Sequence, residues 1–287
     1  MLTHTFPPLI LAVLASVSLA SFAVAAPILE TSVESSTYAL SDVKTGPPPT
    51  QITSAFNHVA QSNTLNASAS ADVGGHSAAK VEGSFASPAF GINNAIAIAR
   101  LTYSTTNTTG AAADFFFTFS ILGPRLEIRD SSQAGLNMHS VGAPDASYTA
   151  QIQVNGDPIW RSFAELYGGR NGHLLFEEDT DLGGTRYGTG GLIGYQFSNY
   201  GNTLPLGTFA NGETITVEAV LQVDLSSAWL DLGALAQIGD PNALGTTGGF
   251  SGDFSNVPEP ATATLLLIGF AFAGMRRPHF QVGRKSA

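Results

Sequence analysis

The chain contains no cysteine and few charged residues. The absence of cysteine among its 287 residues excludes disulfide bonds, thiolate metal ligands and a cysteine nucleophile. Export remains compatible with this composition, because a domain of this size does not need disulfide bonds to be stable. Only 12% of the residues are charged, about half the usual share in soluble proteins. Glycine, serine, threonine, asparagine and alanine take their place, as is typical of exported β-proteins with many turns.

Basic residues are scarce over most of the length. Residues 1–256 contain 8 Lys and Arg against 21 Asp and Glu, a net charge of −13, whereas residues 257–287 contain 4 Lys and Arg against one Glu, a net charge of +3. An acidic folded part argues against nucleic acid as a partner, because binding to phosphate groups needs positive charge. The basic end instead fits a tail on the cytoplasmic side of a membrane.

Helical periodicity is also almost absent, and short alternating segments replace it. Residues 215–225 alternate apolar and polar side chains and predict a half-buried strand. The apolar-aromatic run at 112–122 predicts a strand buried on both faces, and segment 96–103 suggests one buried face with a bulge or register change. Only residues 230–238 predict a short helix. The pattern as a whole predicts an all-β ectodomain over residues 27–238, an antiparallel β-sandwich or jelly roll.

One turn can be assigned from its residues. The dipeptide Asn155-Gly156 separates two apolar segments and predicts a β-hairpin, because both central positions of a type I′ turn need positive φ. Pro158, two residues after Gly156, places that arm at a sheet edge, since proline cannot donate a hydrogen bond to a neighbouring strand.

The N-terminus has the composition of a secretory signal peptide. An apolar run over residues 9–24 is followed by the small residues Ala25 and Ala26, which predicts a signal peptide over 1–26 cleaved after one of these alanines. No Lys or Arg precedes the run. The alternative is an uncleaved anchor helix.

The C-terminal end combines a proline-flanked acid, an apolar run and a basic pair. The segment Val257-Pro258-Glu259-Pro260 is held extended by its prolines, which exposes Glu259. The uncharged run at 261–275 covers roughly 22 Å as a helix, less than the ~30 Å hydrocarbon core of a bilayer. Because Arg276 and Arg277 would stop translocation, the flanks favour a single transmembrane helix.

Two further segments flank the C-terminal motif and its apolar run. Residues 239–256 are rich in glycine and serine and predict a flexible spacer between the ectodomain and the motif. Residues 278–287 predict a basic cytoplasmic tail after the sorting signal at 257–277.

This C-terminal arrangement resembles the PEP-CTERM sorting signal of exported proteins in Gram-negative bacteria that make exopolysaccharide. In that family a Pro-Glu-Pro motif, one hydrophobic helix and an arginine-rich end are recognised by exosortase, a multi-pass membrane transpeptidase that processes the protein near the motif. The resemblance covers about the last thirty residues and implies inner-membrane anchoring before processing, then delivery to the cell surface or extracellular matrix. The chain departs from the family by continuing for ten residues after Arg277. The alternative is a plain membrane anchor.

An acidic cluster is the candidate metal site. Glu177, Glu178, Asp179 and Asp181 could donate oxygens to calcium, which prefers carboxylate and carbonyl ligands. The cluster lacks the ligand spacing of an EF-hand loop, and the alternative is a solvated acidic loop. No other cofactor is predicted.

No pattern of catalytic residues stands out, so we expect no enzyme. Metal-ligand spacing and a nucleophile elbow are both missing, and no carboxylate pair typical of a glycosidase can be singled out among the acids. Five aromatic residues could stack on sugar rings, although Trp160 fits a core position better. Asn66 and Asn107 begin glycosylation sequons. The histidines considered are His4, His58, His76, His139, His173 and His279, and the aromatic residues are Trp160, Tyr167, Tyr187, Tyr195 and Tyr200.

These observations lead to one functional hypothesis and one alternative. We expect an exported surface or matrix protein that exosortase sorts and processes, with a structural or adhesive role in an exopolysaccharide matrix. The alternative is a carbohydrate-binding or carbohydrate-cleaving jelly-roll protein. Extracellular polysaccharide is the expected partner of the ectodomain in both.

Overall fold

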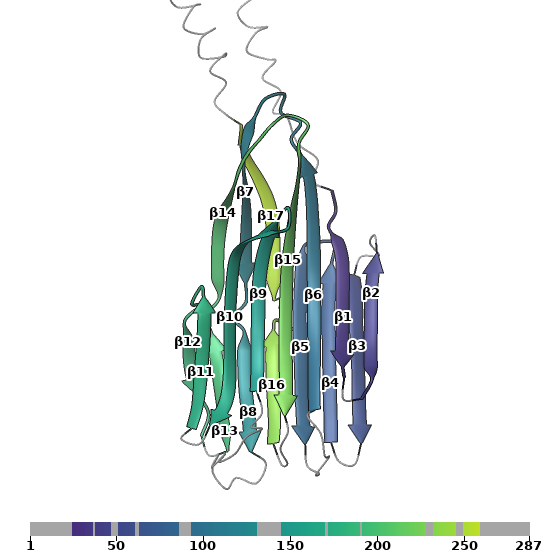
Figure 1. The fold of residues 1–287 in the computed structure, drawn as a ribbon, viewed down its shortest axis with the longest axis vertical. Helices are drawn as coiled ribbons and strands as arrows, with labels where there is room; N and C mark the ends of the chain where they lie inside the picture. Colours follow the sequence, from purple (N-terminus) through teal and green to yellow (C-terminus); the bar gives the residue numbers. More distant parts are fainter. Residues whose placement is uncertain are drawn as a thin grey trace, which may run out of the picture.

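The computed structural model describes residues 25–258, except residues 37, 47–50, 61–62, 86–92, 131–144, 170–171, 190, 228–231 and 245–248. Within this part, seventeen strands form two antiparallel sheets of seven and ten strands that pack face to face (Figure 1). The prediction of an all-β antiparallel fold is confirmed, with more strands than the eight of a simple jelly roll. No helix among the described residues is long and apolar enough to cross a membrane. The predicted signal peptide up to residue 24, the predicted membrane helix at 261–275 and the predicted cytoplasmic tail at 278–287 lie outside the described residues.

The seven-stranded sheet is built around two long neighbouring strands. β15 (Thr214–Ser227) and β6 (Asn93–Thr106) pair over their full lengths in an unbroken antiparallel register. Alternate side chains of β15 are buried, which confirms the strand predicted at 215–225. The strand order is β11-β10-β9-β15-β6-β1-β2, in which the flanking strands are β11 (Gly172–Asp179), β10 (Asp157–Gly169), β9 (Asp145–Val154), β1 (Ile28–Ser35) and β2 (Leu40–Gly46).

The ten-stranded sheet is long because three positions in it hold two strands placed end to end. These pairs are β7 (Ala113–Ile121) with β8 (Arg125–Asp130), β14 (Tyr200–Phe209) with β13 (Leu192–Phe197), and β17 (Phe250–Pro258) with β16 (Leu232–Ile238). The remaining strands are β12 (Gly184–Tyr187), β5 (His76–Phe85), β4 (Asn63–Asp72) and β3 (Gln51–Ala60). One half of the sheet therefore consists of β14, β7 and β17 alone, and it forms the narrow upper end in Figure 1.

Side-chain size in the core changes along the molecule. The broad half is rich in buried alanine, whereas aromatic rings fill the narrow half. The Phe117 and Phe254 ring centroids lie 5.5 Å apart in an edge-to-face contact, and Tyr103 packs against both rings. Such aromatic pairs stabilise a core by more than the burial of their apolar area alone. The buried alanines of the broad half are Ala67, Ala69, Ala71, Ala79, Ala95, Ala97, Ala99, Ala146, Ala150, Ala234 and Ala236.

The predicted hairpin at Asn155-Gly156 is confirmed. Asn155 (φ 51°) and Gly156 (φ 92°) both adopt positive φ between β9 and β10. Pro158 lies on a stretch of β10 that pairs only with β9, because the pairing with β11 begins at Ser162. It sits at a locally free edge and at a register shift, where the missing N–H is tolerated.

The predictions for two apolar segments are wrong in their detail. β7 alternates buried and exposed residues, so the run at 112–122 is buried on one face only, as a two-layer sandwich requires. In segment 96–103 the register with β15 continues without a bulge. Ala97 and Ala99 face the core together with Leu101, while Ile96 and Ile98 lie on the opposite face.

Two further predictions are corrected near the C-terminal end. Residues 232–238 form strand β16 instead of a helix, because Ala234, Ala236 and Ile238 alternate toward the core. The predicted flexible spacer at 239–256 is wrong over its second part, since β17 begins at Phe250. Phe250 and Phe254 bury their rings in the aromatic half of the core, which fixes this segment in the sheet.

Candidate functional site

The strand β17 carries the chain directly into the predicted sorting motif. Val257 pairs with Asp114 and Pro258 pairs with Ala113 at the beginning of β7. Hydrogen-bonded pairs alternate along antiparallel strands, and the N–H of Leu122 donates to the carbonyl of Gly249. Every second residue of β17 counted from Gly249, up to Val257, therefore faces β7 with its backbone N–H and carbonyl. The backbone of Pro258 faces away from β7, so its missing N–H costs the sheet no hydrogen bond.

The structure thus places only the beginning of the predicted sorting site. The backbones of Val257 and Pro258 end β17. Glu259, Pro260, Arg276 and Arg277 lie outside the described residues.

Two loops at the same end of the molecule are joined through Asn107. We call the loops at 107–112 and 210–213, together with the end of β17, the motif pole (Figure 1). The Asn107 side chain is fully buried, and its Nδ2 donates to the carbonyls of Phe209 (2.7 Å) and Ala111 (2.8 Å). Its backbone N–H donates to the Glu213 carbonyl (2.9 Å), and its carbonyl accepts from Gly212 N–H (2.7 Å). One residue therefore holds both loops in a fixed arrangement.

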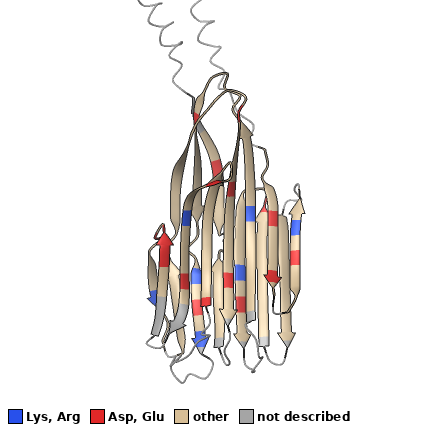
Figure 2. Cartoon of the chain, viewed as in Figure 1, with Lys and Arg blue, Asp and Glu red and all other residues tan. Residues whose placement is uncertain are grey.

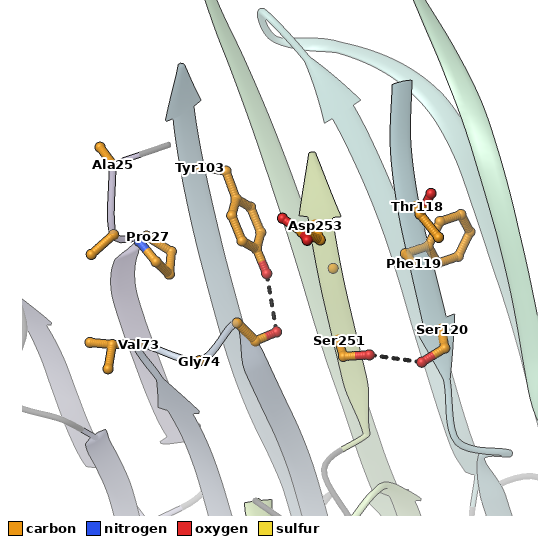
Figure 3. Close-up of a pocket in the computed structure, with 13 residues that line it drawn as sticks. Ala25, Pro27, Val73, Gly74, Tyr103, Thr118, Phe119, Ser120, Ser251 and Asp253 are labelled. Carbon is orange, nitrogen blue, oxygen red and sulfur yellow. Dashed lines mark hydrogen bonds between the residues drawn. The ribbon is translucent and has the colours of Figure 1, made fainter. Parts of the chain in front are cut away.

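A hollow of about 550 Å³ lies beside β17, just before the motif (Figure 3). Its walls come from β17, β7, the β4–β5 turn and residues 25–27, with Tyr103 between them. The Tyr103 hydroxyl donates to the Gly75 carbonyl (3.1 Å), and burial raises the pKa of this phenol, which keeps it neutral. Because Ala25 and Ala26 line the hollow, cleavage at the predicted position would leave the new N-terminus at its rim.

The four acidic residues predicted to bind calcium do not converge. Glu177, Glu178 and Asp179 are successive residues of the edge strand β11, so neighbouring side chains point to opposite faces. Arg161 Nη1 lies 3.7 Å from Glu178 Oε2 and 3.2 Å from Asp179 Oδ2. Among the described residues, which include Asp181, no group of three or more acidic or histidine side chains could hold a metal ion. The geometry gives the calcium prediction no support.

The histidines take structural roles where the structure describes their side chains. His76 Nδ1 lies 3.1 Å from Asp72 Oδ1, and the His58 ring centroid lies 4.0 Å from that of Tyr38. His4, His139 and His279 lie outside the described residues, as does the side chain of His173.

The aromatic candidates divide between the core and the surface. Trp160 is buried and stacks on Tyr200 with centroids 5.7 Å apart, which confirms its predicted core position. Tyr195 packs against the core, whereas Tyr187 lies on the outer face of the ten-stranded sheet. The side chain of Tyr167 lies outside the described residues. Tyr187 is therefore the aromatic residue best placed to contact a ligand.

The two sequons are found in structured segments. Asn66 lies within β4 and pairs with strands on both sides. The buried, hydrogen-bonded amide of Asn107 leaves no room for a sugar on the folded protein.

A network of charged side chains on the outer face of the ten-stranded sheet was missed from the sequence. We call it the Glu127 network. Glu127 of β8 is fully buried although it points away from the core, because Arg125, Arg129 and Tyr187 all donate hydrogen bonds to its carboxylate. Arg129 also lies 3.6 Å from Glu82. Figure 2 shows the alternation of basic and acidic residues along β8.

The packing of Tyr187 explains how the network covers Glu127. The ring lies over Gly194 so closely that any side chain there would collide with it. Burial alone would raise the pKa of Glu127, but the hydrogen bonds from Tyr187, Arg129 and Arg125 together hold it below its ordinary value. The carboxylate is covered, while the Arg125 and Arg129 side chains remain 41% and 47% exposed. This surface therefore presents hydrogen-bond donors to solvent.

Register between distant strands creates this network. Glu127 lies opposite Gly194 of β13, which in turn lies opposite Tyr187 of β12. The alternation of Arg125, Glu127 and Arg129 around apolar residues was the one signal in the sequence that these three share a face.

The outer face of the seven-stranded sheet carries an acidic group instead. Burial raises the pKa of Asp145 to about 6, with a further contribution from Glu165, and the hydroxyl of Ser226 opposes this effect. Burial also raises the pKa of Asp224. An aspartate with a raised pKa binds its proton more tightly in the folded state. Its contribution to stability is present below the unfolded pKa and is lost as the pH rises through about 6.

Asp145→Asn is therefore expected to stabilise the protein at neutral pH. We expect a gain of about 1 kcal/mol in the free energy of unfolding at pH 7, since half-exposed groups are partly screened, and little gain at pH 4. Urea unfolding at the two pH values measures the difference, and Asp157→Asn, at an exposed position, is the matched control. An equal effect of Asp145→Asn at both pH values would contradict the burial of this carboxyl.

Comparison with known proteins identifies the C-terminal signal. The sequence model of the PEP-CTERM protein-sorting motif matches residues 256–277. No curated protein matches the chain. The motif implies an exported protein that is anchored in the membrane during processing, with exosortase as the processing partner.

Proposed function

We propose that this chain, a PEP-CTERM protein by its sorting motif, is a structural or adhesive component of an exopolysaccharide matrix and has no enzymatic activity. In this proposal the signal peptide starts export, and the helix at 261–275 anchors the protein in the inner membrane of a Gram-negative bacterium. Exosortase then cuts near Pro258-Glu259-Pro260 and delivers the ectodomain to the surface or matrix.

The observation that carries the proposal is the continuity of the motif with β17. Every strand in the part of the chain that the structure describes precedes Glu259, and β17 packs Phe250 and Phe254 into the core. A cut near the motif therefore leaves the described strands of both sheets together, on the side away from the membrane anchor. Release of the folded domain in this way is sufficient for the proposed role as a scaffold.

Fractionation of cells that produce exopolysaccharide tests the matrix role. We expect the processed protein to sediment with the polysaccharide and to be released when the polymer is digested. Its appearance in the soluble medium of both producing and non-producing cells would overturn the matrix role. Release of reducing ends from purified polymer by the protein alone would show an enzyme instead.

Carbohydrate binding is a second candidate, and the Glu127 network favours it. Exposed guanidinium groups beside a tyrosine ring suit polymers that carry carboxylate and hydroxyl oxygens. Arg161 offers a matched control, because it is also about half exposed and also pairs with acidic residues, but on the other sheet.

Arg129→Ala is expected to weaken binding to a uronic-acid polysaccharide about tenfold, since one charge-assisted contact is lost. Arg161→Ala should leave binding unchanged. Isothermal titration with a defined uronate oligosaccharide measures both, after thermal melting has shown that the variants are folded. Equal affinities for the two variants would remove the Glu127 network as the binding surface.

A further inference from the structure

We infer that the motif pole is a docking surface for the exported face of exosortase, so that the enzyme contacts the folded domain as well as the motif. This inference rests on the proposed sorting function. The partner that we infer is a protein, exosortase, and not the lipid surface. Three features support it: the small number of residues in the sequence between the end of β17 and the apolar run, the hydrogen bonds that fix the pole, and the charge of the pole.

The tether between the domain and the membrane is very short. β17 keeps its pairing with β7 as far as Pro258, and the apolar run of the signal begins at residue 261. Three residues reach at most about 10 Å even when fully extended. An enzyme that binds the motif at the membrane surface must therefore lie against whatever part of the domain surrounds the end of β17.

That part of the domain is rigid. Besides the four hydrogen bonds of Asn107 described above, Asn107 Oδ1 accepts from both the N–H (3.0 Å) and the hydroxyl (2.8 Å) of Thr109. Asn211 Oδ1 accepts from Gly110 N–H (2.9 Å), which links the two loops a second time. A surface fixed in this way loses little conformational freedom when a partner binds.

The charge of the pole favours a protein partner over lipid. The described residues of the two loops include no Lys or Arg, and Glu213 is their acidic residue. Anionic lipid headgroups attract basic segments, so they would not hold this surface. The exposed residues Thr108, Gly110, Ala111 and Ala112 instead offer a small, neutral surface that another protein can approach closely.

Large charged side chains at the pole test the inference. We expect Thr108→Arg combined with Ala112→Arg to slow processing of the full-length precursor about tenfold in cells that produce exosortase, because the new side chains obstruct the contact. Thr108→Glu with Ala112→Glu should slow it similarly. Thr185→Arg, at an exposed threonine of β12 far from the pole, is the matched control and should be processed at the normal rate.

A linker provides the second test. Twelve glycine and serine residues inserted between Asn256 and Val257 would let the motif move away from the domain. We therefore expect the linker to restore processing of the arginine variant to within about twofold of the rate of the protein without the arginine substitutions. Pulse-chase labelling measures every rate. Normal processing of both pole variants without the linker would overturn the inference. Faster processing with arginine and slower processing with glutamate would identify the lipid surface as the partner and would overturn it too.

These outcomes are separable from a failure of the sorting proposal. If Glu259→Ala blocks processing while the pole variants are processed normally, the motif is recognised and only the docking inference fails. If Glu259→Ala is also processed normally, the sorting proposal itself fails.

Discussion

Phe254→Ala is expected to lower the free energy of unfolding of the exported protein by about 3–5 kcal/mol, the range for a large aromatic side chain removed from a core. Phe254 is only 6% exposed and lies edge-to-face with Phe117, at a centroid distance of 5.5 Å. Its other aromatic neighbour, Tyr103, packs at 6.3 Å. The truncation would leave a cavity between rings that cannot collapse without breaking the pairing of β17 with β7.

Ser255→Ala is the matched control, because Ser255 is the exposed neighbour on the same strand and its substitution should change stability by no more than about 0.5 kcal/mol. Urea denaturation followed by tryptophan fluorescence measures both variants, and Trp160 reports on the core directly. A loss below about 1 kcal/mol for Phe254→Ala would mean that 250–256 is the flexible spacer that its composition suggests.

Asn107→Ala is expected to cost about 3 kcal/mol, because a fully buried side chain loses four hydrogen bonds at once. The buried carbonyl of Phe209 would lose its side-chain donor and the N–H of Thr109 would lose its acceptor, whereas the Ala111 carbonyl would keep the hydroxyl of Thr109 as a donor. Buried polar groups without a partner are more costly than the net value of the hydrogen bonds themselves.

Thr108→Ala serves as the control for the pole, since Thr108 is exposed and adjoins Asn107. Hydrogen exchange of the loops at 107–112 and 210–213 should speed up in Asn107→Ala and stay slow in Thr108→Ala. Unchanged exchange and stability in Asn107→Ala would show that other contacts hold the motif pole together. The hydrogen bonds of Asn107 would then no longer support a rigid docking surface.

Strands whose pattern is local could be predicted from the sequence. Residues 215–225 alternate without a break and form most of β15, and Asn155-Gly156 forms the expected turn. The sorting motif belongs to the same class, because its prolines, apolar run and arginines are contiguous in the sequence.

Features that depend on distant strands could not be predicted. The glycines and serines of 249–256 indicate a spacer, and only the structure shows that Phe250 and Phe254 complete a core begun by β7. In segment 96–103 isoleucine is the more apolar choice for the core, yet the alanines face it, because strands β4 and β5 of the opposite sheet pack against β6 and also bury alanines. Glu127 and Tyr187 are 60 residues apart and meet only through the register of three strands.

The sorting signal and the proposed binding surface differ in how far the sequence alone identifies them. A sorting signal is read as a linear segment, so its identity follows from the sequence and is supported by the match at residues 256–277. The binding surface proposed for the ectodomain, the Glu127 network on β8 and β12, is instead assembled from several strands. Binding measurements on variants of the Glu127 network test whether this surface binds a ligand.

The central claim is that the sorting signal is removed while β17 stays in the folded domain. The terminal peptides of the exported protein test this claim most directly. Mass spectrometry of the surface or matrix fraction is expected to find an N-terminus at Ala26 or Pro27 and a C-terminus between Pro258 and Ala261, with Phe254 retained. An exported chain that still contains Arg276 and Arg277, or one that ends before Phe250, would contradict it.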